Sequence, residues 1–354
     1  MKAHSSRFLV LYVALLVISQ AMPMAAAQPS AHLDANDPHQ AAMLVRQGRY
    51  REAIDALSVL LRQKPGNPAL LNNRAVAHAK LGNYAAAIAD LSQAIMIDPQ
   101  DAGAYFNRGL ALRNLGRHQQ AIADLSEALR LGGADAATYY NRALALEGLG
   151  RYQEAIADYD RTIRLAPRHP LAYSRRALAY DALGRHQQAD EEYGRTLQLE
   201  GADPVTLNNR CAARTARLEL DAALADCNAA LHMAPNYAAA YYNRALILLQ
   251  RHQDSRAVQD LDQALRLAPR LVAAHRARAV AHRRLQDWPA ALTDYNHILQ
   301  AQPRNAAIYR ARAMVYQKLG HDERARQDLA TAARLSSGTS ADPAARPSVR
   351  IAGN

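Results

Sequence analysis

Two columns of opposite charge recur at a spacing of 34 residues along the chain. The basic column contains Arg74, Arg108, Arg142, Arg176, Arg210, Arg244, Arg278 and Arg312. The acidic column contains Asp90, Asp124, Asp158, Glu192, Asp226, Asp260, Asp294 and Asp328. A guanidinium group can bind a carboxylate through two parallel hydrogen bonds, and each of these Arg residues has an acidic counterpart. We therefore expect structural ion pairs, within a repeat or between neighbours; the alternative is an Arg stripe that faces a ligand.

A column of amide side chains follows the same spacing and directly precedes the basic column. It contains Asn73, Asn107, Asn141, Asn209 and Asn243, and it is interrupted by Arg175 and absent from the last two repeats. An amide both donates and accepts hydrogen bonds, so a spaced column can hold the backbone of an extended peptide. Phe106, Tyr140 and Tyr242 stand beside it and would add apolar contact. The alternative is a local structural role at the start of each helix.

Unpaired basic residues gather near the C-terminal end of the repeats, whereas acidic residues lie in the middle. The basic cluster contains Arg276, Arg283, Arg284, Arg310 and Lys318, and the acidic residues are Glu147 and Asp181. An acidic segment of a partner would fit the basic cluster. A solvated basic face is the alternative.

Both cysteines, Cys211 and Cys227, lie in one repeat. In an oxidising compartment they would form a disulfide, whereas two small buried thiols are the alternative. The chain contains no metal-ligand spacing such as HExxH or CxxC, no Gly-rich phosphate loop and no nucleophile elbow. The sequence therefore predicts no catalytic site, no metal site and no cofactor.

The spacing itself predicts pairs of helices. An alanine stands at every thirty-fourth position from Ala53 to Ala325, without insertion or deletion. A turn glycine recurs at Gly48, Gly82, Gly116, Gly150, Gly184 and Gly320, and the series is broken by Leu218, His252 and Gln286. Within each repeat, apolar residues recur at helical spacing on both sides of this turn. Each repeat should therefore form two helices that meet closely at the small alanine.

The turn motif Gly-x-Tyr-x-x-Ala occurs at 48–53, 82–87 and 150–155. Together with the 34-residue unit and its terminal Pro, it resembles the tetratricopeptide repeat (TPR) over roughly residues 34–335. This resemblance implies an all-α fold, a right-handed α-solenoid of nine helix-turn-helix units. It also implies a concave face, lined by the first helices and the Asn column, that binds other proteins.

The predicted organisation begins with a cleavable signal peptide at 1–27 and a linker at 28–33. Lys2 and Arg7 precede an apolar stretch at 8–18, and small residues at 25–27 form a cleavage site. Retention of this leader as a membrane anchor is the alternative. The repeats occupy 34–339, divided into 34–67, 68–101, 102–135, 136–169, 170–203, 204–237, 238–271, 272–305 and 306–339. The small, polar residues 340–354 predict a disordered tail.

The formal net charge of +11, carried by 39 Arg and only four Lys, raises the question of an anionic partner. The paired columns cancel one another, and an export signal argues against nucleic acid. We therefore expect a non-catalytic scaffold or adaptor, periplasmic or secreted, that binds a peptide or partner subunit in the cell envelope and keeps no membrane span after cleavage. The alternatives are a structural subunit of a secretion or polysaccharide-export assembly, and a nucleic-acid binder that uses the Arg surplus.

Overall fold

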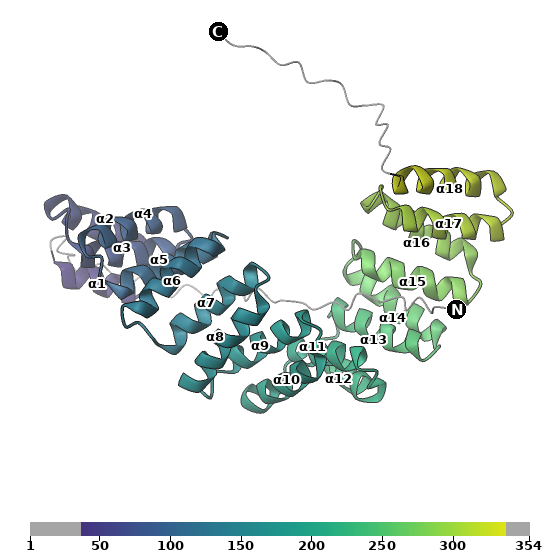
Figure 1. The fold of residues 1–354 in the computed structure, drawn as a ribbon, viewed down its shortest axis with the longest axis horizontal. Helices are drawn as coiled ribbons and strands as arrows, with labels where there is room; N and C mark the ends of the chain where they lie inside the picture. Colours follow the sequence, from purple (N-terminus) through teal and green to yellow (C-terminus); the bar gives the residue numbers. More distant parts are fainter. Residues whose placement is uncertain (1–36, 338–354) are drawn as a thin grey trace, which may run out of the picture. The chain divides into compact units, whose positions relative to one another are not determined.

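The structure, a computed structural model, describes residues 37–337. The signal peptide, the linker and the C-terminal tail expected from the sequence therefore lie outside the described residues. Every regular element in the described range is an α-helix. Helices of odd number begin each repeat and helices of even number complete it, so successive pairs form antiparallel hairpins (Figure 1).

The helices divide into two compact units, one ending at Ala202 and the other beginning at Asp203. The first unit contains α1 (Pro38–Arg46), α2 (Tyr50–Gln63), α3 (Pro68–Lys80), α4 (Tyr84–Ile97), α5 (Ala102–Asn114), α6 (His118–Arg130), α7 (Ala136–Gly148), α8 (Tyr152–Leu165), α9 (Pro170–Ala182) and α10 (His186–Glu200). The second contains α11 (Pro204–Ala216), α12 (Leu220–Met233), α13 (Ala238–Gln250), α14 (Asp254–Leu267), α15 (Val272–Arg284), α16 (Trp288–Ala301), α17 (Ala306–Lys318) and α18 (Asp322–Ser336).

Within each unit a helix packs mainly on the helices before and after it in sequence. First helices of adjacent repeats also touch, as α3 touches α5 and α11 touches α13. This nearest-neighbour packing is that of an α-solenoid, in which each hairpin buries its apolar face against the next. The described chain is thus an all-α solenoid of nine hairpins, as the sequence predicts.

The alanine that marks the period forms the closest contact of each hairpin. All nine members, from Ala53 to Ala325, have at most 1% of their surface exposed. A side chain of one carbon lets the second helix approach the first closely, and interiors at this packing density leave no room for a larger group. Close packing of the two helices therefore explains why alanine recurs at this position.

All the first helices except α13 and α15 begin at polar caps, and the hairpin turns use left-handed backbone. The side chains of Asn67, Asp101 and Asp135 accept hydrogen bonds from backbone N–H groups in the first turns of α3, α5 and α7. The turn glycines have φ between 71° and 79°, a region that costs little only for glycine. Leu218, His252 and Gln286 adopt the same conformation, with φ of 64°, 56° and 62°. Thus the break in the glycine series does not change the turn.

No helix among residues 37–337 combines the length and hydrophobicity needed to cross a membrane.

Candidate functional site

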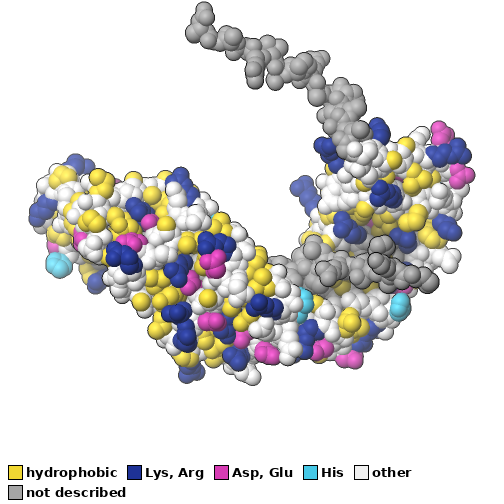
Figure 2. Space-filling model, viewed as in Figure 1, with side chains coloured by type: hydrophobic (Ala, Val, Ile, Leu, Met, Phe, Trp, Pro, Cys, Tyr) yellow, Lys and Arg dark blue, Asp and Glu magenta, His cyan; other side chains and the backbone are white. Residues whose placement is uncertain are grey.

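A pocket opens on the second unit where the first helices α13, α15 and α17 meet the start of α16. Its volume is about 770 Å³, which lies in the range of protein ligand sites. Its basic lining residues are Arg276, Arg283, Arg284 and Lys318, and no Asp or Glu lines it. Figure 2 shows Lys and Arg side chains gathered over the C-terminal helices, with hydrophobic side chains between them.

The cations of the pocket differ in whether they form hydrogen bonds or ion pairs within the protein. Arg284 donates to the carbonyl oxygen of Leu249 at 2.8 Å and forms an ion pair with Asp254 at 3.1 Å. Arg283 lies 3.4 Å from the hydroxyl of Tyr295. Within residues 37–337, no ion pair joins Arg276, Arg283 or Lys318 to a carboxylate. Three positive charges therefore face the pocket without an acidic partner in the described chain.

Four of the five basic residues that the sequence groups together line this pocket. Arg310 does not; it stands one repeat after Arg276 at the same repeat position, and it donates to Ser336 at the end of α18 at 2.6 Å. The aromatic residue Tyr242 does line the pocket. Burial raises the pKa of Tyr242 to about 12 against the opposing effect of Arg276, so its hydroxyl stays neutral and adds no negative charge.

Asparagines of the predicted binding column form hydrogen bonds within the fold. The amide nitrogen of Asn107 donates to Asn72 in the preceding repeat at 2.8 Å. Asn141 accepts from Arg113 and donates to the backbone oxygen of Ala137. The side chains of Asn73, Asn107 and Asn141 remain partly exposed. A role for these three in holding a peptide stays a prediction, but the contacts of Asn107 and Asn141 already serve the packing of adjacent first helices.

In the second unit the column is less open than the sequence suggested. Asn209 is 4% exposed and Asn243 is 1% exposed. Asn243 donates to Asn208 in the preceding repeat at 2.9 Å, the same contact that Asn107 makes in the first unit. The side chains of Asn209 and Asn243 are therefore buried beside Asn208, and a role for them in holding a peptide stays a prediction.

Aromatic and charged side chains surround Asn141 on the first-helix side of the first unit. Tyr140 packs 4.9 Å from the ring of His169, and Phe106 is half-buried. Arg175 forms an ion pair with Glu147 at 3.3 Å, and Glu147 accepts from the hydroxyl of Tyr159. The acidic residue Asp181 likewise accepts from the buried Tyr193. Glu147 and Asp181 are thus hydrogen-bonded to the second helices of their own hairpins.

The two charged columns form ion pairs inside each hairpin. All eight Arg residues meet the acidic residue sixteen positions later, with closest nitrogen–oxygen distances of 2.6–2.8 Å. In the fourth repeat, Arg142 donates to both oxygens of Asp158 at 2.7 and 2.8 Å. The eight acidic residues are at most 7% exposed. Because the carboxylates are buried and matched, the columns hold the fold rather than present charge to a ligand.

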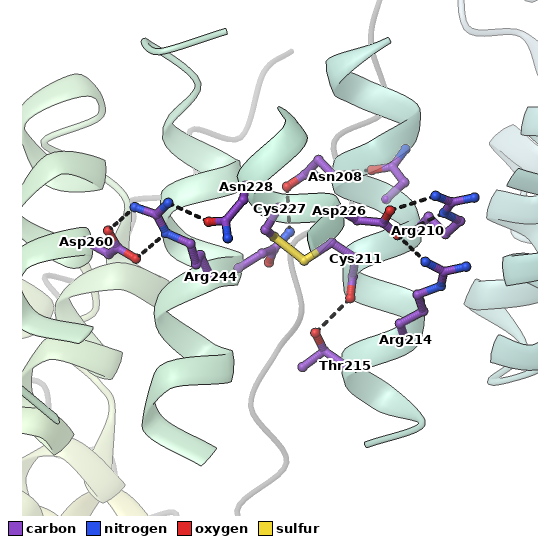
Figure 3. The surroundings of a disulfide bond; sticks show 12 residues. Asn208, Arg210, Cys211, Arg214, Thr215, Asp226, Cys227, Asn228, Arg244 and Asp260 are labelled. Carbon is purple, nitrogen blue, oxygen red and sulfur yellow. Dashed lines mark hydrogen bonds and ion pairs between the residues drawn. A yellow bond between two sulfur atoms is a disulfide. The ribbon is translucent and has the colours of Figure 1, made fainter. Parts of the chain in front are cut away.

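The same Arg side chains also connect adjacent hairpins. In seven of the eight the third nitrogen donates to a polar residue on the preceding second helix, at Ser58, Ser92, Ser126, Asp160, Asn228, Asp262 and Asn296. Figure 3 shows one case, in which Arg244 reaches both Asp260 and Asn228. One guanidinium thus joins three helices, which a Lys side chain could not do with fixed geometry.

A disulfide joins Cys211 on α11 to Cys227 on α12, with a Cα–Cα distance of 5.6 Å (Figure 3). All the other repeats carry Ala or Gly at the position of Cys211 and Leu or Tyr at that of Cys227. In the third repeat a side chain added at Gly109 would touch Leu125, the equivalent pair. The cysteines therefore replace an apolar contact that every hairpin makes.

Comparison with protein families matches four segments of the chain. Models described as "TPR repeat" or "Tetratricopeptide repeat" match residues 79–116, 102–134, 136–169 and 250–306. The matched segments carry the same helical hairpins and the same turn geometry described above. The chain is a tetratricopeptide-repeat protein.

Solved structures agree with this TPR fold. The crystal structure of the APC/C hetero-tetramer Cut9-Hcn1 shares 16% sequence identity with this chain, with a TM-score of 0.54 over 84% of this chain and 60% of the other. A tetratricopeptide repeat protein from Parabacteroides merdae shares 19% identity, with a TM-score of 0.51 over 69% of this chain and 96% of the other. MamA shares 28% identity over 45% of this chain and 87% of its own, with a TM-score of 0.43. No curated protein sequence matches the chain.

As a TPR protein, the chain is a scaffold for protein interactions, a role that the repeat generally fills without catalysis. Sequence reasoning missed two features of its pocket. Trp288, at the start of α16, lines the pocket, and Ala277 leaves space where earlier repeats carry Asn. The signals were present: Trp288 is the one Trp of the sequence, and the Asn column ends at Ala277.

Proposed function

We propose that this TPR protein is exported to the cell envelope and there binds an extended peptide or a partner subunit on the face formed by its first helices. The observation that carries the binding part is the pocket of the second unit, where α13, α15 and α17 bring Arg276, Arg283 and Lys318 together without acidic partners. Cations without acidic partners beside apolar side chains suit a ligand that is both acidic and apolar, because guanidinium groups bind carboxylates through charge-assisted hydrogen bonds. Export rests on the basic and apolar residues at 2–18 and the small residues at 25–27.

The binding face can be tested by site-specific photo-crosslinking in cells that express the full chain. A photoreactive phenylalanine analogue replaces Tyr140 on α7 or Met314 on α17, both on first helices. The matched control replaces Arg161, which is exposed on α8 of the same hairpin as Tyr140. Discrete adducts at the two first-helix sites and none at Arg161 support the proposal. Equal labelling from all three sites, or from Arg161 alone, contradicts it.

Export has a separate test. Mass spectrometry of the protein isolated from the envelope or periplasmic fraction should give a mature N-terminus at Gln28. A chain that begins at Met1 and stays with the cytoplasmic fraction would rule out export. This outcome would leave the interaction face untouched, so the two parts of the proposal fail independently.

A further inference from the structure

We propose that the pocket of the second unit binds a protein segment in which carboxylates flank a large apolar side chain. This inference rests on the proposed function and names the ligand chemistry and the place on the scaffold that receives it. It applies to the pocket between α13, α15, α16 and α17, whose lining mixes cations with apolar side chains.

The charge of the pocket selects an anion. Arg276 and Lys318 are exposed and Arg283 is half-buried, and none of the three has a carboxylate partner within residues 37–337. Elsewhere in the second unit the ladder Arg residues are neutralised by buried acids, whereas these three cations lie together beside apolar side chains in one pocket. Guanidinium groups bind carboxylates through paired, charge-assisted hydrogen bonds. Two Arg and one Lys can therefore hold two or more carboxylates at the rim.

The wall of the pocket selects an apolar side chain. Val272, Val280, Trp288, Met314 and Val315 line it beside the cations. Met314 is 46% exposed, and its flexible thioether can adapt to the shape of a guest. The space exists because Ala277 stands where the earlier column has Asn, so no amide fills it. A Phe, Leu or Met side chain would displace water from this surface.

The same residues disfavour a nucleic-acid strand. Single-stranded nucleic acid binds along a basic groove with successive aromatic platforms for its bases. This pocket offers a single indole, and its cations surround aliphatic side chains instead of following a phosphate track. A peptide with both acidic and apolar side chains can contact the cations and the aliphatic side chains of the pocket at the same time.

Trp288 makes the test direct, because it is the sole Trp of the chain and lines the pocket. Its fluorescence in the full mature chain is followed while a capped peptide, Gly-Asp-Glu-Phe-Asp-Leu-Gly, is added. The expected result is a saturable change that weakens with added salt. Two matched peptides, one with Asn and Gln in place of the acids and one with Ser in place of Phe and Leu, should bind at least about tenfold more weakly.

Variants identify the site. The double substitution Arg276→Gln and Arg283→Gln should weaken binding of the acidic peptide by at least about tenfold. The control is Arg266→Gln with Arg270→Gln, two exposed Arg residues of the same unit that lie outside the pocket, and it removes the same charge. The charge-reversed pair Arg276→Glu and Arg283→Glu should instead favour a peptide with Lys in place of the acids. Circular dichroism verifies that each variant stays helical.

Three outcomes would overturn the inference. One is equal weakening by the control pair, which would indicate attraction to net charge alone. Another is binding of the neutral peptide as tightly as the acidic one. The third is a pocket-dependent response to a thymidine oligonucleotide or to phosphatidylglycerol vesicles but none to the peptide. The Arg276→Gln and Arg283→Gln variant separates this inference from the proposed function. If the acidic peptide does not bind but position-specific crosslinks from the first helices persist in this variant, the scaffold function is supported and only the assignment of this pocket is wrong.

Discussion

Three residues hold the hairpin turn in a conformation that their side chains disfavour. Leu218, His252 and Gln286 have positive φ at the position where the other turns use glycine. A left-handed backbone brings the Cβ atom close to a backbone oxygen and costs about 1–2 kcal/mol per residue. All three lie in the second unit. The packing of each hairpin therefore fixes the turn even where the sequence does not favour it.

Leu218→Gly should stabilise the protein. The leucine side chain is 72% exposed, so its removal loses little packing. Relief of the backbone strain in the turn outweighs the extra flexibility of glycine in the unfolded chain. The expected gain in the free energy of unfolding is about 0.5–1 kcal/mol. Urea unfolding followed by circular dichroism measures it. Leu218→Ala, which removes the side chain but keeps the Cβ atom, is the control and should bring no gain.

Asp294 is the most buried acid of the ladder, with no exposed surface. Burial opposes its ionisation, but hydrogen bonds from His275 and Arg278 outweigh this, and the pKa of Asp294 lies below its ordinary value of 3.8. A lowered pKa in the folded state means that the ionised group stabilises the fold above the unfolded pKa. That contribution is lost as the pH falls through the folded pKa.

Arg278→Met should therefore destabilise the protein in a pH-dependent way. At pH 7 the variant leaves a buried carboxylate without its guanidinium partner, and the expected loss is about 3 kcal/mol. As the pH falls below about 4, protonation of Asp294 removes the benefit in the parent, and the two proteins should converge. Urea unfolding at a series of pH values tests this. Arg276→Met, two residues earlier on the same helix and without a carboxylate partner, should show no such convergence, and a constant difference for Arg278→Met would contradict the ion-pair account.

At the scale of a hairpin, the same pair of positions on the two helices holds an apolar contact in one repeat and a disulfide in another. The small residue of the first helix meets a large residue of the second, as Gly109 meets Leu125. Cys211 and Cys227 occupy this pair of positions and form a covalent bond there. Because both residues are fully buried, the bond lies inside the packed interface of α11 and α12.

Removing this bond should weaken the second unit. Cys211→Ala opens a loop of roughly 15 residues, whose closure is worth about 3 kcal/mol in the chain-entropy description. The parent should unfold at lower urea after reduction, whereas the variant should not respond to the reductant. Cys211→Ala combined with Cys227→Leu restores the apolar pair of other hairpins and should recover part of the loss. Identical midpoints for the oxidised and reduced parent would show that the bond contributes nothing.

The helices and ion pairs could be predicted because both partners of each contact lie in one repeat at fixed spacing. Arg142 and Asp158 illustrate this, since their separation recurs in every later hairpin. The Asn column is different. The partner of Asn107 is Asn72 of the previous repeat, and that of Asn141 is Arg113, so the neighbouring repeat decides what each amide does. The basic residues of the pocket could be grouped from the sequence, but Trp288 and the space beside Ala277 were missed for the same reason, because the pocket forms between repeats whose residues depart from the pattern.

At the scale of the whole molecule, most of the charge is accounted for locally. The ladder combines eight Arg with eight acids and adds no net charge. Other Arg residues pair within one turn of a helix, as Arg130 does with Glu127. Arg276, Arg283 and Lys318 have no such partner in the described chain, and they share one pocket with apolar side chains. The grouping of these cations, and not the net charge of +11, distinguishes the pocket, since Arg266 and Arg270 also lack an ion pair within residues 37–337.

Nearest-neighbour packing also predicts how a local change spreads. In a repeat protein each hairpin is stabilised by its own contacts and by the adjacent hairpins, so a perturbation should weaken with distance along the chain. Hydrogen exchange of the oxidised and reduced protein measures this. Reduction of the disulfide should lower amide protection most in α11 and α12, less in α13 and α14, and not in α3 to α6. An equal loss of protection across all these helices would mean that the chain unfolds as a single cooperative body, and the description of independent neighbouring contacts would be wrong.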